Sequence, residues 1–350
     1  MRLVRLLLVA LNVVCAILLL ASTLAGEVPP SRWVGISLLS YGYVLFFGLN
    51  VAFVLLWIVL RRWTFLLSVA AIVLRHSFIP LFFQLGFVSG GGNSSDSSTL
   101  KVMTFNVHNF VGRDGELPYG EGAAKFVNLV RQQQPDVLCV QEFYSNAVAY
   151  NVVDSLSRMG YRYRHGYKGA SYGLLLFSKY KLRNVKDLGH SRKFYADIQK
   201  DGIPVRLLCV HLASYHLEYD DLATMDNLAH GQRDSNTFGM VSKFCRTIRQ
   251  HEQEWRDDLL PVIESYDGAL MLIGDCNDTP ASYLYQQAVL HLTDTYRERG
   301  FGLGTTYHGP FPAYRIDYLF HNAALTALNY KRIRCDISDH YPLVAEYALQ

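Results

Sequence analysis

Two stretches decide the fold class of this chain: LMLIGDCND, residues 270–278, and SDHYPLV, residues 338–344. In each, a short apolar run typical of a buried strand stands next to a cluster of carboxylate, amide or imidazole side chains. Polar groups at the end of a buried strand lie where a sheet edge opens onto solvent. We therefore expect both stretches to border one cleft. The residues concerned are Asp275, Asn277, Asp339 and His340.

Four further segments have the same character. Each alone is more often a turn or a helix cap, since Asp, Asn and Glu are common there. The ordered combination of six is far more specific. The segments are VMTFNVHNF (102–110) with Asn106, PDVLCVQEF (135–143) with Glu142, RLLCVHL (206–212) with His211, and RIDYLF (315–320) with Asp317.

Taken in order, these six segments resemble the endonuclease/exonuclease/phosphatase superfamily. That superfamily contains pancreatic-type DNases, apurinic/apyrimidinic endonucleases, inositol-polyphosphate 5-phosphatases and neutral sphingomyelinases. The resemblance covers residues 100–350. It implies an α/β (α+β) fold, a four-layered β-sandwich of the DNase I-like type, with the active site at one edge of two packed sheets.

The resemblance also implies a divalent-metal site. Glu142 is then the principal ligand, and Asn106 and Asp339 complete or support it. Hard oxygen ligands of this kind suit Mg²⁺ or Mn²⁺ better than zinc. One metal ion and two both fit this ligand set.

The remaining motif residues take catalytic roles by the same resemblance. Asp275 and Asn277 orient the attacking water and hold a phosphate oxygen or a second metal. His340 is the catalytic histidine, as a base or as a stabiliser of charge, and Asp317 fixes its tautomer. His211 donates to a non-bridging phosphate oxygen.

Three apolar segments precede this region, at residues 3–25, 34–60 and 63–88. Each has the roughly 20 residues that a membrane-spanning helix needs. An alternative for the first is a cleaved signal peptide, because basic residues precede it and small residues end it. The domains expected are a transmembrane region (1–88), a flexible linker (89–99, SGGGNSSDSST) and a catalytic domain (100–350).

Basic residues predict the orientation of these helices. Arg2 and Arg5 precede the first segment, and Arg61 and Arg62 separate the second from the third. The positive-inside rule then places the N-terminus in the cytoplasm and the catalytic domain on the extracytoplasmic side. Arg75–His76 falls near the middle of the third segment, where a charge is costly. We therefore expect that segment to be broken, and a segment that fails to span would leave the domain in the cytoplasm.

The charge balance of the soluble part bears on its substrates. Residues 1–90 hold six of the 33 basic residues and one of the 30 acidic residues, so residues 91–350 carry 27 basic and 29 acidic, a net charge of −2. Proteins that grip DNA through many phosphates carry a basic surplus. Nucleic acid is thus an alternative substrate that charge does not favour, and nothing in the sequence indicates a partner protein.

Three local features remain open from sequence. A basic stretch between 156 and 196 reads either as solvated strand edges or as a surface for an anionic substrate or lipid. A polar insertion after His211 either shapes substrate access or is a solvent loop. The cysteines lack metal-type spacing and are expected to be free buried thiols, with one disulfide as the alternative in an oxidising compartment. The basic residues are Arg158, Arg162, Arg164, Lys168, Lys179, Lys181, Arg183, Lys186, Arg192 and Lys193, and the insertion holds His216, Glu218, Asp220, Asp221 and Asp226.

Together these features predict a membrane-anchored, Mg²⁺-dependent phosphoesterase that cleaves a phosphodiester or phosphomonoester by metal-assisted attack of water. A lipid headgroup or a soluble phosphoester is the expected substrate. Alternatives are a membrane-held nuclease and a non-catalytic binding module on the same fold, although the intact set of motif residues argues against the module.

Overall fold

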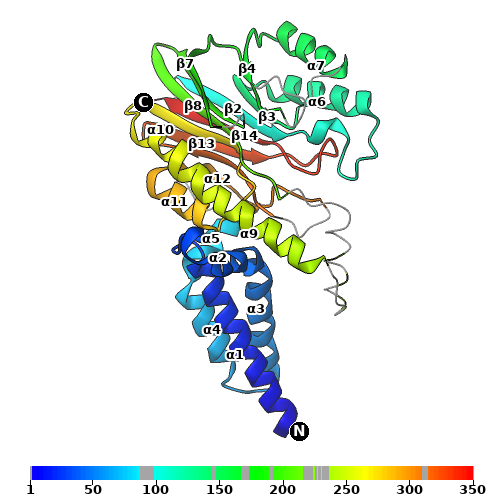
Figure 1. Ribbon diagram of the computed structural model, residues 1–350, viewed down its shortest axis with the longest axis vertical. Coiled ribbons are helices and arrows are strands. Elements are labelled where there is room, and N and C mark those ends of the chain that lie inside the picture. The colour runs from blue at the N-terminus through cyan, green and yellow to red at the C-terminus, as the bar shows by residue number, and fades with distance from the viewer. Residues whose placement is uncertain are drawn as a thin grey trace. The chain divides into compact units, whose positions relative to one another are not determined.

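The computed structural model describes residues 2–86, 98–143, 147–166, 173–189, 192–215, 224, 227, 230, 236–309 and 314–349 (Figure 1). Most of the predicted linker and all five named residues of the polar insertion lie outside these ranges. The chain forms two compact units. The first comprises Met1–Phe82, Ser214–Trp255 and Asp278–Leu290, and the second comprises Phe83–Ala213, Arg256–Asn277 and His291–Gln350.

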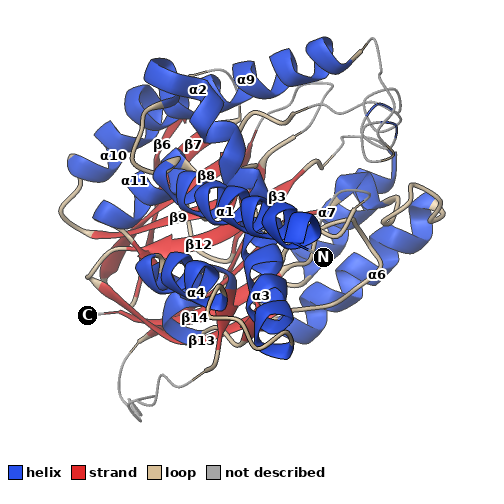
Figure 2. Ribbon diagram, turned by 90° about the horizontal axis from the view of Figure 1, so that it is seen from below, coloured by secondary structure: helices blue, strands red, loops and turns tan. Residues whose placement is uncertain are grey.

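The second unit is built on two six-stranded sheets, drawn as red arrows in Figure 2. One has the order β10-β12-β9-β8-β7-β6 and the other β13-β14-β2-β3-β5-β4. Both are mixed, because β8–β9 and β2–β3 pair in parallel and the other neighbours are antiparallel. The strands are β2 (Thr99–Asn106), β3 (Val137–Gln141), β4 (Tyr163–Gly166), β5 (Leu175–Ser178), β6 (Arg183–Leu188), β7 (Lys193–Lys200), β8 (Ile203–His211), β9 (Ala269–Asp275), β10 (Thr293–Asp294), β12 (Asp317–His321), β13 (Leu325–Arg332) and β14 (Leu343–Leu349).

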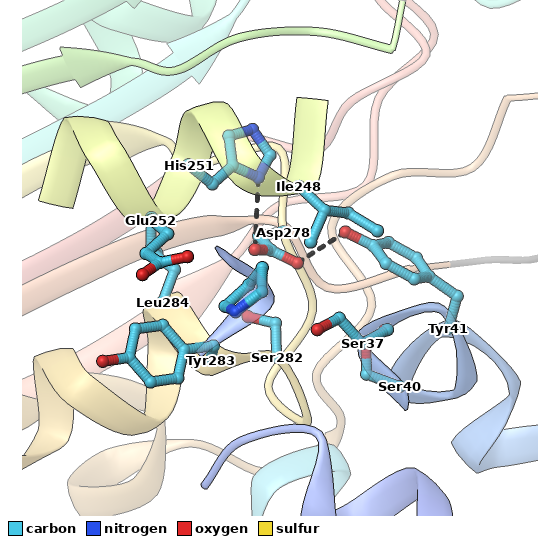
Figure 3. A pocket seen from close by; sticks show the side chains of 11 residues that line it. Ser37, Ser40, Tyr41, Ile248, His251, Glu252, Asp278, Ser282, Tyr283 and Leu284 are labelled. Carbon is cyan, nitrogen blue, oxygen red and sulfur yellow. Dashed lines mark hydrogen bonds and ion pairs between the residues drawn. The ribbon is translucent and has the colours of Figure 1, made fainter. Parts of the chain in front are cut away.

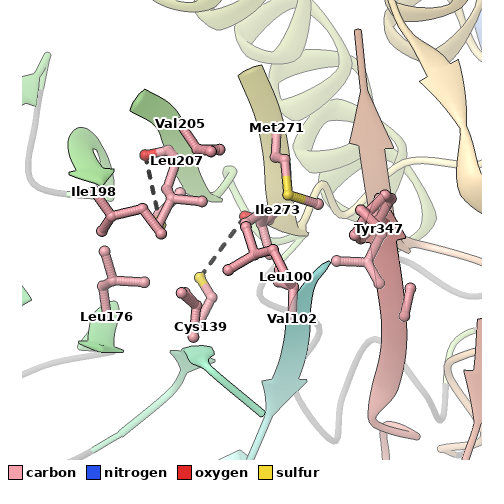
Figure 4. Packing of buried hydrophobic residues seen from close by; sticks show 14 of the residues in the cluster. Leu100, Val102, Cys139, Leu176, Ile198, Val205, Leu207, Met271, Ile273 and Tyr347 are labelled. Carbon is pink, nitrogen blue, oxygen red and sulfur yellow. Dashed lines mark hydrogen bonds between the residues drawn. The ribbon is translucent and has the colours of Figure 1, made fainter. Parts of the chain in front are cut away.

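The core of this unit lies between the two sheets. Leu100, Val102 and Cys139 of one sheet face Leu207 and Ile273 of the other, all fully buried (Figure 4). The opposite face of the β2–β3 sheet packs on two helices, α6 (Tyr119–Gln133) and α7 (Ala147–Arg158). Strands buried on both faces read as continuous apolar runs, which is why sequence located them. The expected α/β fold with two packed sheets is confirmed.

The helical stretch over residues 237–264 is not one continuous α-helix. It is divided into α9 (Thr237–Glu254), a π-helical turn η4 (Trp255–Leu259) and α10 (Leu260–Glu264). Pro261 explains the change near the end, because proline has no N–H to continue an α-helix. The shorter elements of the second unit are β1 (Phe83–Gln84), η3 (His108–Phe110), α12 (Thr295–Arg299) and β11 (Gly302–Leu303).

The first unit contains the apolar helices. Two helical stretches, Arg2–Leu24 and Pro30–Val59, are long and apolar enough to cross a membrane. A third stretch is a pair, Phe65–Leu74 and His76–Phe82, bent by 61°. The break expected at Arg75 is therefore present. The helices are α1 (Arg2–Leu24), α2 (Pro30–Leu38), η1 (Leu39–Gly42), α3 (Tyr43–Val59), α4 (Phe65–Leu74), η2 (His76–Phe78), α5 (Ile79–Phe82), α9 and α11 (Tyr283–His291).

A buried polar network joins α1, α3 and α4. Asn12 donates from Nδ2 to Ser68 Oγ (2.6 Å), and Ser68 donates from Oγ to Asn50 Oδ1 (2.8 Å). Trp57 Nε1 donates to Asn12 Oδ1 (2.9 Å), and Asn50 Nδ2 donates to the carbonyl of Cys15 (2.9 Å). Hydrogen bonds between helices are the usual means of satisfying polar side chains in an apolar bundle.

Candidate active site

Strand register brings the predicted site residues together. The parallel strands β8 and β9 pair His211 with Asp275, and β12, antiparallel to β9, pairs Asp317 with Asp275. In the other sheet the parallel strands β2 and β3 end side by side, at Asn106 and immediately before Glu142. Parallel strands end at the same sheet edge, so five residues from five segments meet at one place.

Unusual backbone conformations shape this edge. Gly274 has φ +141°, and an added Cβ would lie 2.0 Å from the carbonyl oxygen of Val210, so only glycine lets β9 approach β8 here. Glu142, Asn277 and His108 also have positive φ, at 53°, 50° and 41°. Such conformations are rare for residues other than glycine and concentrate at functional sites.

Asn106 links the two sheets at the site. Its buried Nδ2 donates to Glu142 Oε1 (3.1 Å) and to Asp275 Oδ2 (3.0 Å), and its Oδ1 accepts from the backbone N–H of His108 (3.1 Å). Burial opposes ionisation of Glu142, but the proximity of His211 and the Asn106 amide outweigh it, so the pKa of Glu142 is lowered. Glu142 therefore presents an anionic oxygen at this edge, held in place by Asn106.

His211 is buried, and among the described residues neither of its ring nitrogens has a hydrogen-bond partner. Its Nε2 lies 3.8 Å from Glu142 Oε1 and 3.9 Å from Asp275 Oδ2, beyond hydrogen-bond distance. Burial, aided by the charge of Arg192, lowers the pKa of His211 to about 4, so the ring is neutral near pH 7. An unpaired buried donor is costly, which indicates that the ring serves a bound ligand.

Asp275 is held beside Asn277 in the turn that follows β9. Its Oδ1 accepts from the backbone N–H of Asn277 (2.8 Å), and the Asn277 side chain donates to the carbonyl of Leu212 (3.1 Å). Burial and the nearby carboxylate of Asp317 raise the pKa of Asp275 to about 7. Two carboxylates this close disfavour each other's charge, and a cation relieves that repulsion.

His340 and Asp317 form a buried pair. The Nδ1–H of His340 donates to Asp317 Oδ2 (2.8 Å), and no residue in the described part of the chain forms a hydrogen bond with Asp317 Oδ1. Burial opposes protonation of His340, but Asp317 overcomes it and raises the pKa of His340 well above its ordinary value. Thr306 Oγ1 accepts from the backbone N–H of Asp317 (3.0 Å), and the ring of Tyr307 meets that of His340 edge-on at 5.1 Å.

Asp339 is connected to the other site residues by His108 and Ser338, which the sequence analysis did not single out. Its Oδ1 lies 3.4 Å from His108 Nδ1, and Ser338 Oγ donates to the Asn106 carbonyl (2.7 Å). His108 and Ser338 stand inside the quoted motifs, so their position was a usable signal. Tyr307 carried none, because it reaches the site only by bridging to His340.

The donor chemistry of this edge fits a divalent cation. Asp317 Oδ1 and the ring nitrogens of the neutral His211 have no hydrogen-bond partner among the described residues, and ionisation of Asp275 is disfavoured. A bound cation would stabilise the two carboxylates, and a bound phosphate would accept a hydrogen bond from His211. Within the described ranges, ligand atoms of Asp275, Asp317 and His340 lie within 4.8 Å of one another. Since His340 Nδ1 is engaged by Asp317, its Nε2 is the nitrogen left to face Asp275 Oδ2, 4.0 Å away.

The basic stretch does not form a uniform surface. Lys193 is buried and its Nζ lies 3.1 Å from Asp258 Oδ2. Arg183 and Lys186 lie on the exposed edge strand β6, as solvated edge charges do. The positive charge of Arg192 instead helps to lower the pKa of His211. Lys168 lies outside the described residues. The strand-edge interpretation therefore accounts for the residues at β6, and no single interpretation covers the stretch.

A separate pocket lies within the first unit (Figure 3). Tyr41 donates from its hydroxyl to Asp278 Oδ1 (2.6 Å), and His251 Nδ1 lies 3.2 Å from Asp278 Oδ2. Ser31 donates to Glu252 from both its backbone N–H (2.6 Å) and its hydroxyl (2.7 Å). The polar groups named here bond to one another, so we assign this pocket a structural role.

Comparisons with known proteins agree with this geometry. Among curated proteins no sequence matches the chain. Similar solved structures include an endonuclease/exonuclease/phosphatase from Beutenbergia cavernae (20% identity, TM-score 0.50, 72% of each chain covered). They also include the human Nocturnin catalytic domain with bound sulfate anion (17%, 0.52, 73% of this chain and 98% of that one) and an AP endonuclease from Archaeoglobus fulgidus (16%, 0.50, 70% and 98%). At these identities the likeness shows the fold.

Family models cover both parts of the sequence. Residues 4–82 match a domain of unknown function (DUF8431). Residues 103–340 match the Endonuclease/Exonuclease/phosphatase family. The second match spans more than half of the chain and includes every predicted site residue. The chain therefore belongs to the endonuclease/exonuclease/phosphatase family of metal-dependent hydrolases that act on phosphoester bonds.

Proposed function

We propose that the chain is a membrane-anchored phosphoesterase that uses Mg²⁺ or Mn²⁺ to hydrolyse a phosphodiester or phosphomonoester on the extracytoplasmic side. The observation that carries the proposal is the convergence at one sheet edge of a buried, unpartnered His211, the ionised Glu142 and the His340–Asp317 pair. This set provides an anionic metal ligand, a neutral donor and a cationic imidazole, the groups that phosphoester cleavage needs.

Glu142, Asn106 and Asp339 are proposed to hold the ion, which when bound neutralises charge on the phosphoryl oxygens and lowers the pKa of a bound water. His211 donates to a non-bridging oxygen of the substrate. Asp275, whose carboxylate is held by the Asn277 N–H and the Asn106 amide, accepts a proton from the attacking water. His340 remains protonated beside Asp317 and stabilises the charge that develops in the transition state.

A panel of substrates tests this function. The full chain in detergent, with Mg²⁺, is offered DNA, phosphoinositides, sphingomyelin and a generic aryl phosphoester. Hydrolysis that depends on Mg²⁺ and on His340 supports the proposal, and full activity in EDTA refutes the metal role. Preference for DNA over every lipid would instead favour the membrane-held nuclease.

The charges of the first unit support the proposed anchoring and orientation. Arg75 Nη1 lies 3.1 Å from Glu27 Oε1, so the charge that interrupts the third apolar stretch has a partner just beyond the end of α1. Arg61 and Arg62 follow the C-terminal end of α3. The contacts of Trp57 with Asn12 and of Asn50 with Cys15 show that α3 runs antiparallel to α1, so this end of α3 lies toward the N-terminal end of α1. Basic residues gathered at one end of the bundle favour a cytoplasmic position for that end.

A fusion experiment tests the orientation. Alkaline phosphatase, or a fluorescent protein that does not fold outside the cytoplasm, is joined after Ser98 in place of the proposed catalytic domain, 100–350. Phosphatase activity without fluorescence supports the extracytoplasmic site. Fluorescence without phosphatase activity refutes it and makes inner-leaflet lipids and nucleotides the leading substrates.

A further inference from the structure

The small sheet of β1 and β11 in the second unit carries an exposed apolar patch. Phe83 pairs with Leu303 in the register, and Leu85 and Phe301 flank the two strands. The exposed fractions are 41% for Phe83, 57% for Leu85, 80% for Phe301 and 62% for Leu303. The Phe301 ring lies over Gly86, since a Cβ there would be 2.8 Å from Phe301 Cδ2. The four side chains, which we call the β1–β11 patch, are therefore contiguous.

Contiguous exposed apolar groups mark a surface that contacts a partner or a membrane. Here the chain itself indicates a lipid bilayer. Phe83 directly follows Phe82, the last residue of the bent apolar pair, and residues 77–86 contain no charged side chain. The patch thus begins one peptide bond after a segment proposed to lie in the membrane. Arg297, exposed on α12 four residues before Phe301, is suited to contact a lipid phosphate.

The segment that bears the patch continues into the active site. Tyr296 donates from its hydroxyl to the carbonyl of Gly302 (2.6 Å) and so fixes β11 to the body of the unit. A few residues on, Thr306 supports the backbone of Asp317, and Tyr307 contacts the ring of His340. A bilayer contact at Leu303 therefore lies within four residues of chain from groups that touch the catalytic pair.

We propose that the β1–β11 patch inserts into the interfacial layer of the bilayer and holds the active site against the lipid headgroups. The inference rests on the proposed membrane anchoring. A substrate in or on the membrane then reaches the site without leaving the lipid surface, which raises its effective concentration.

Lipid quenching of a fluorophore on the full chain in nanodiscs tests the insertion. Cys245→Ser and Cys335→Ser remove the two partly exposed thiols, since the other four are buried. A single label is then placed by Phe301→Cys in the patch. Lipids with a nitroxide near the headgroup end of the acyl chain should remove most of the fluorescence of this label.

Two matched positions make the outcomes distinct. Val185→Cys places the label at another exposed apolar residue (38%), on the edge strand β6, and should stay bright. Leu55→Cys places it on α3 (60% exposed), where the proposed anchoring predicts quenching. A label at Phe301 as bright as that at Val185, with Leu55 quenched, overturns the docking but leaves the anchor. An unquenched label at Leu55 overturns both.

Discussion

Replacing Asp317 by Asn tests the assignment of His340 as a protonated group. Asp317 is the hydrogen-bond partner of His340 Nδ1 at 2.8 Å, and burial by itself lowers the pKa of His340. With the carboxylate gone, we expect the pKa of His340 to fall toward its ordinary value, because burial disfavours the protonated ring. The substitution should therefore make activity depend on pH across the neutral range.

The expected loss of kcat/KM follows from the fraction of the His340 imidazole that stays protonated. An ordinary imidazole, with a pKa of about 6.5, is roughly 3% protonated near pH 8 and roughly three quarters protonated near pH 6. Loss of the proton from His340 alone should then lower kcat/KM about 30-fold near pH 8 and only slightly near pH 6. Loss of orientation adds to this, so the total near pH 8 should be roughly 10²–10⁴ in kcat/KM.

The assay is kcat/KM at saturating metal from about pH 6 to pH 8 for the wild type and two variants. Asp197→Asn is the matched control. Asp197 is a buried carboxylate on β7, away from the predicted motif residues, and it accepts a hydrogen bond from Arg206 Nε (2.8 Å). It should lower stability and leave the pH profile unchanged. A loss for Asp317→Asn that is constant with pH would refute the charge argument. A large rise in the metal concentration required would make Asp317 a ligand instead.

Three further results are expected. Glu142→Ala should lower kcat by roughly 10²–10⁴ with partial rescue at raised Mg²⁺, whereas His340→Ala should show no rescue; equal rescue would mean that the two roles are exchanged. In metal-free protein, the folded-state pKa of Asp275 is raised from 3.8 to about 7, so its ionisation destabilises the fold progressively as pH rises through that interval. The increase in Tm on adding Mg²⁺ should therefore be larger near pH 8 than near pH 5, and an increase independent of pH would contradict this. Asn50→Leu removes the acceptor of Ser68 and the donor to Cys15, and should cost about 1–2 kcal/mol of unfolding free energy in detergent, measured by thermal unfolding; an unchanged Tm would show that the network contributes nothing.

Sequence anticipated the elements whose pattern is local. The apolar runs around Val102, Val137, Val205 and Leu270 became central strands, because strands buried on both faces must be apolar throughout. The bounds of edge strands such as β6 could not be read from the sequence, since their residues are mostly exposed and carry no such pattern. The charges of this stretch predicted only that it holds solvated strand edges. The break at Arg75 was readable because a charge inside an apolar run has a cost that does not depend on tertiary context.

The chemical groups of this protein and the family to which it belongs can be read from the chain alone, because the motif residues stand in order beside apolar strands. The charge state and the partner of each group depend on tertiary packing. His211 is neutral because it is buried, and His340 is protonated because Asp317 lies 2.8 Å from its Nδ1. Burial and distance between residues far apart in the chain are properties of packing, so the electrostatics of the site appear only once the two sheets meet.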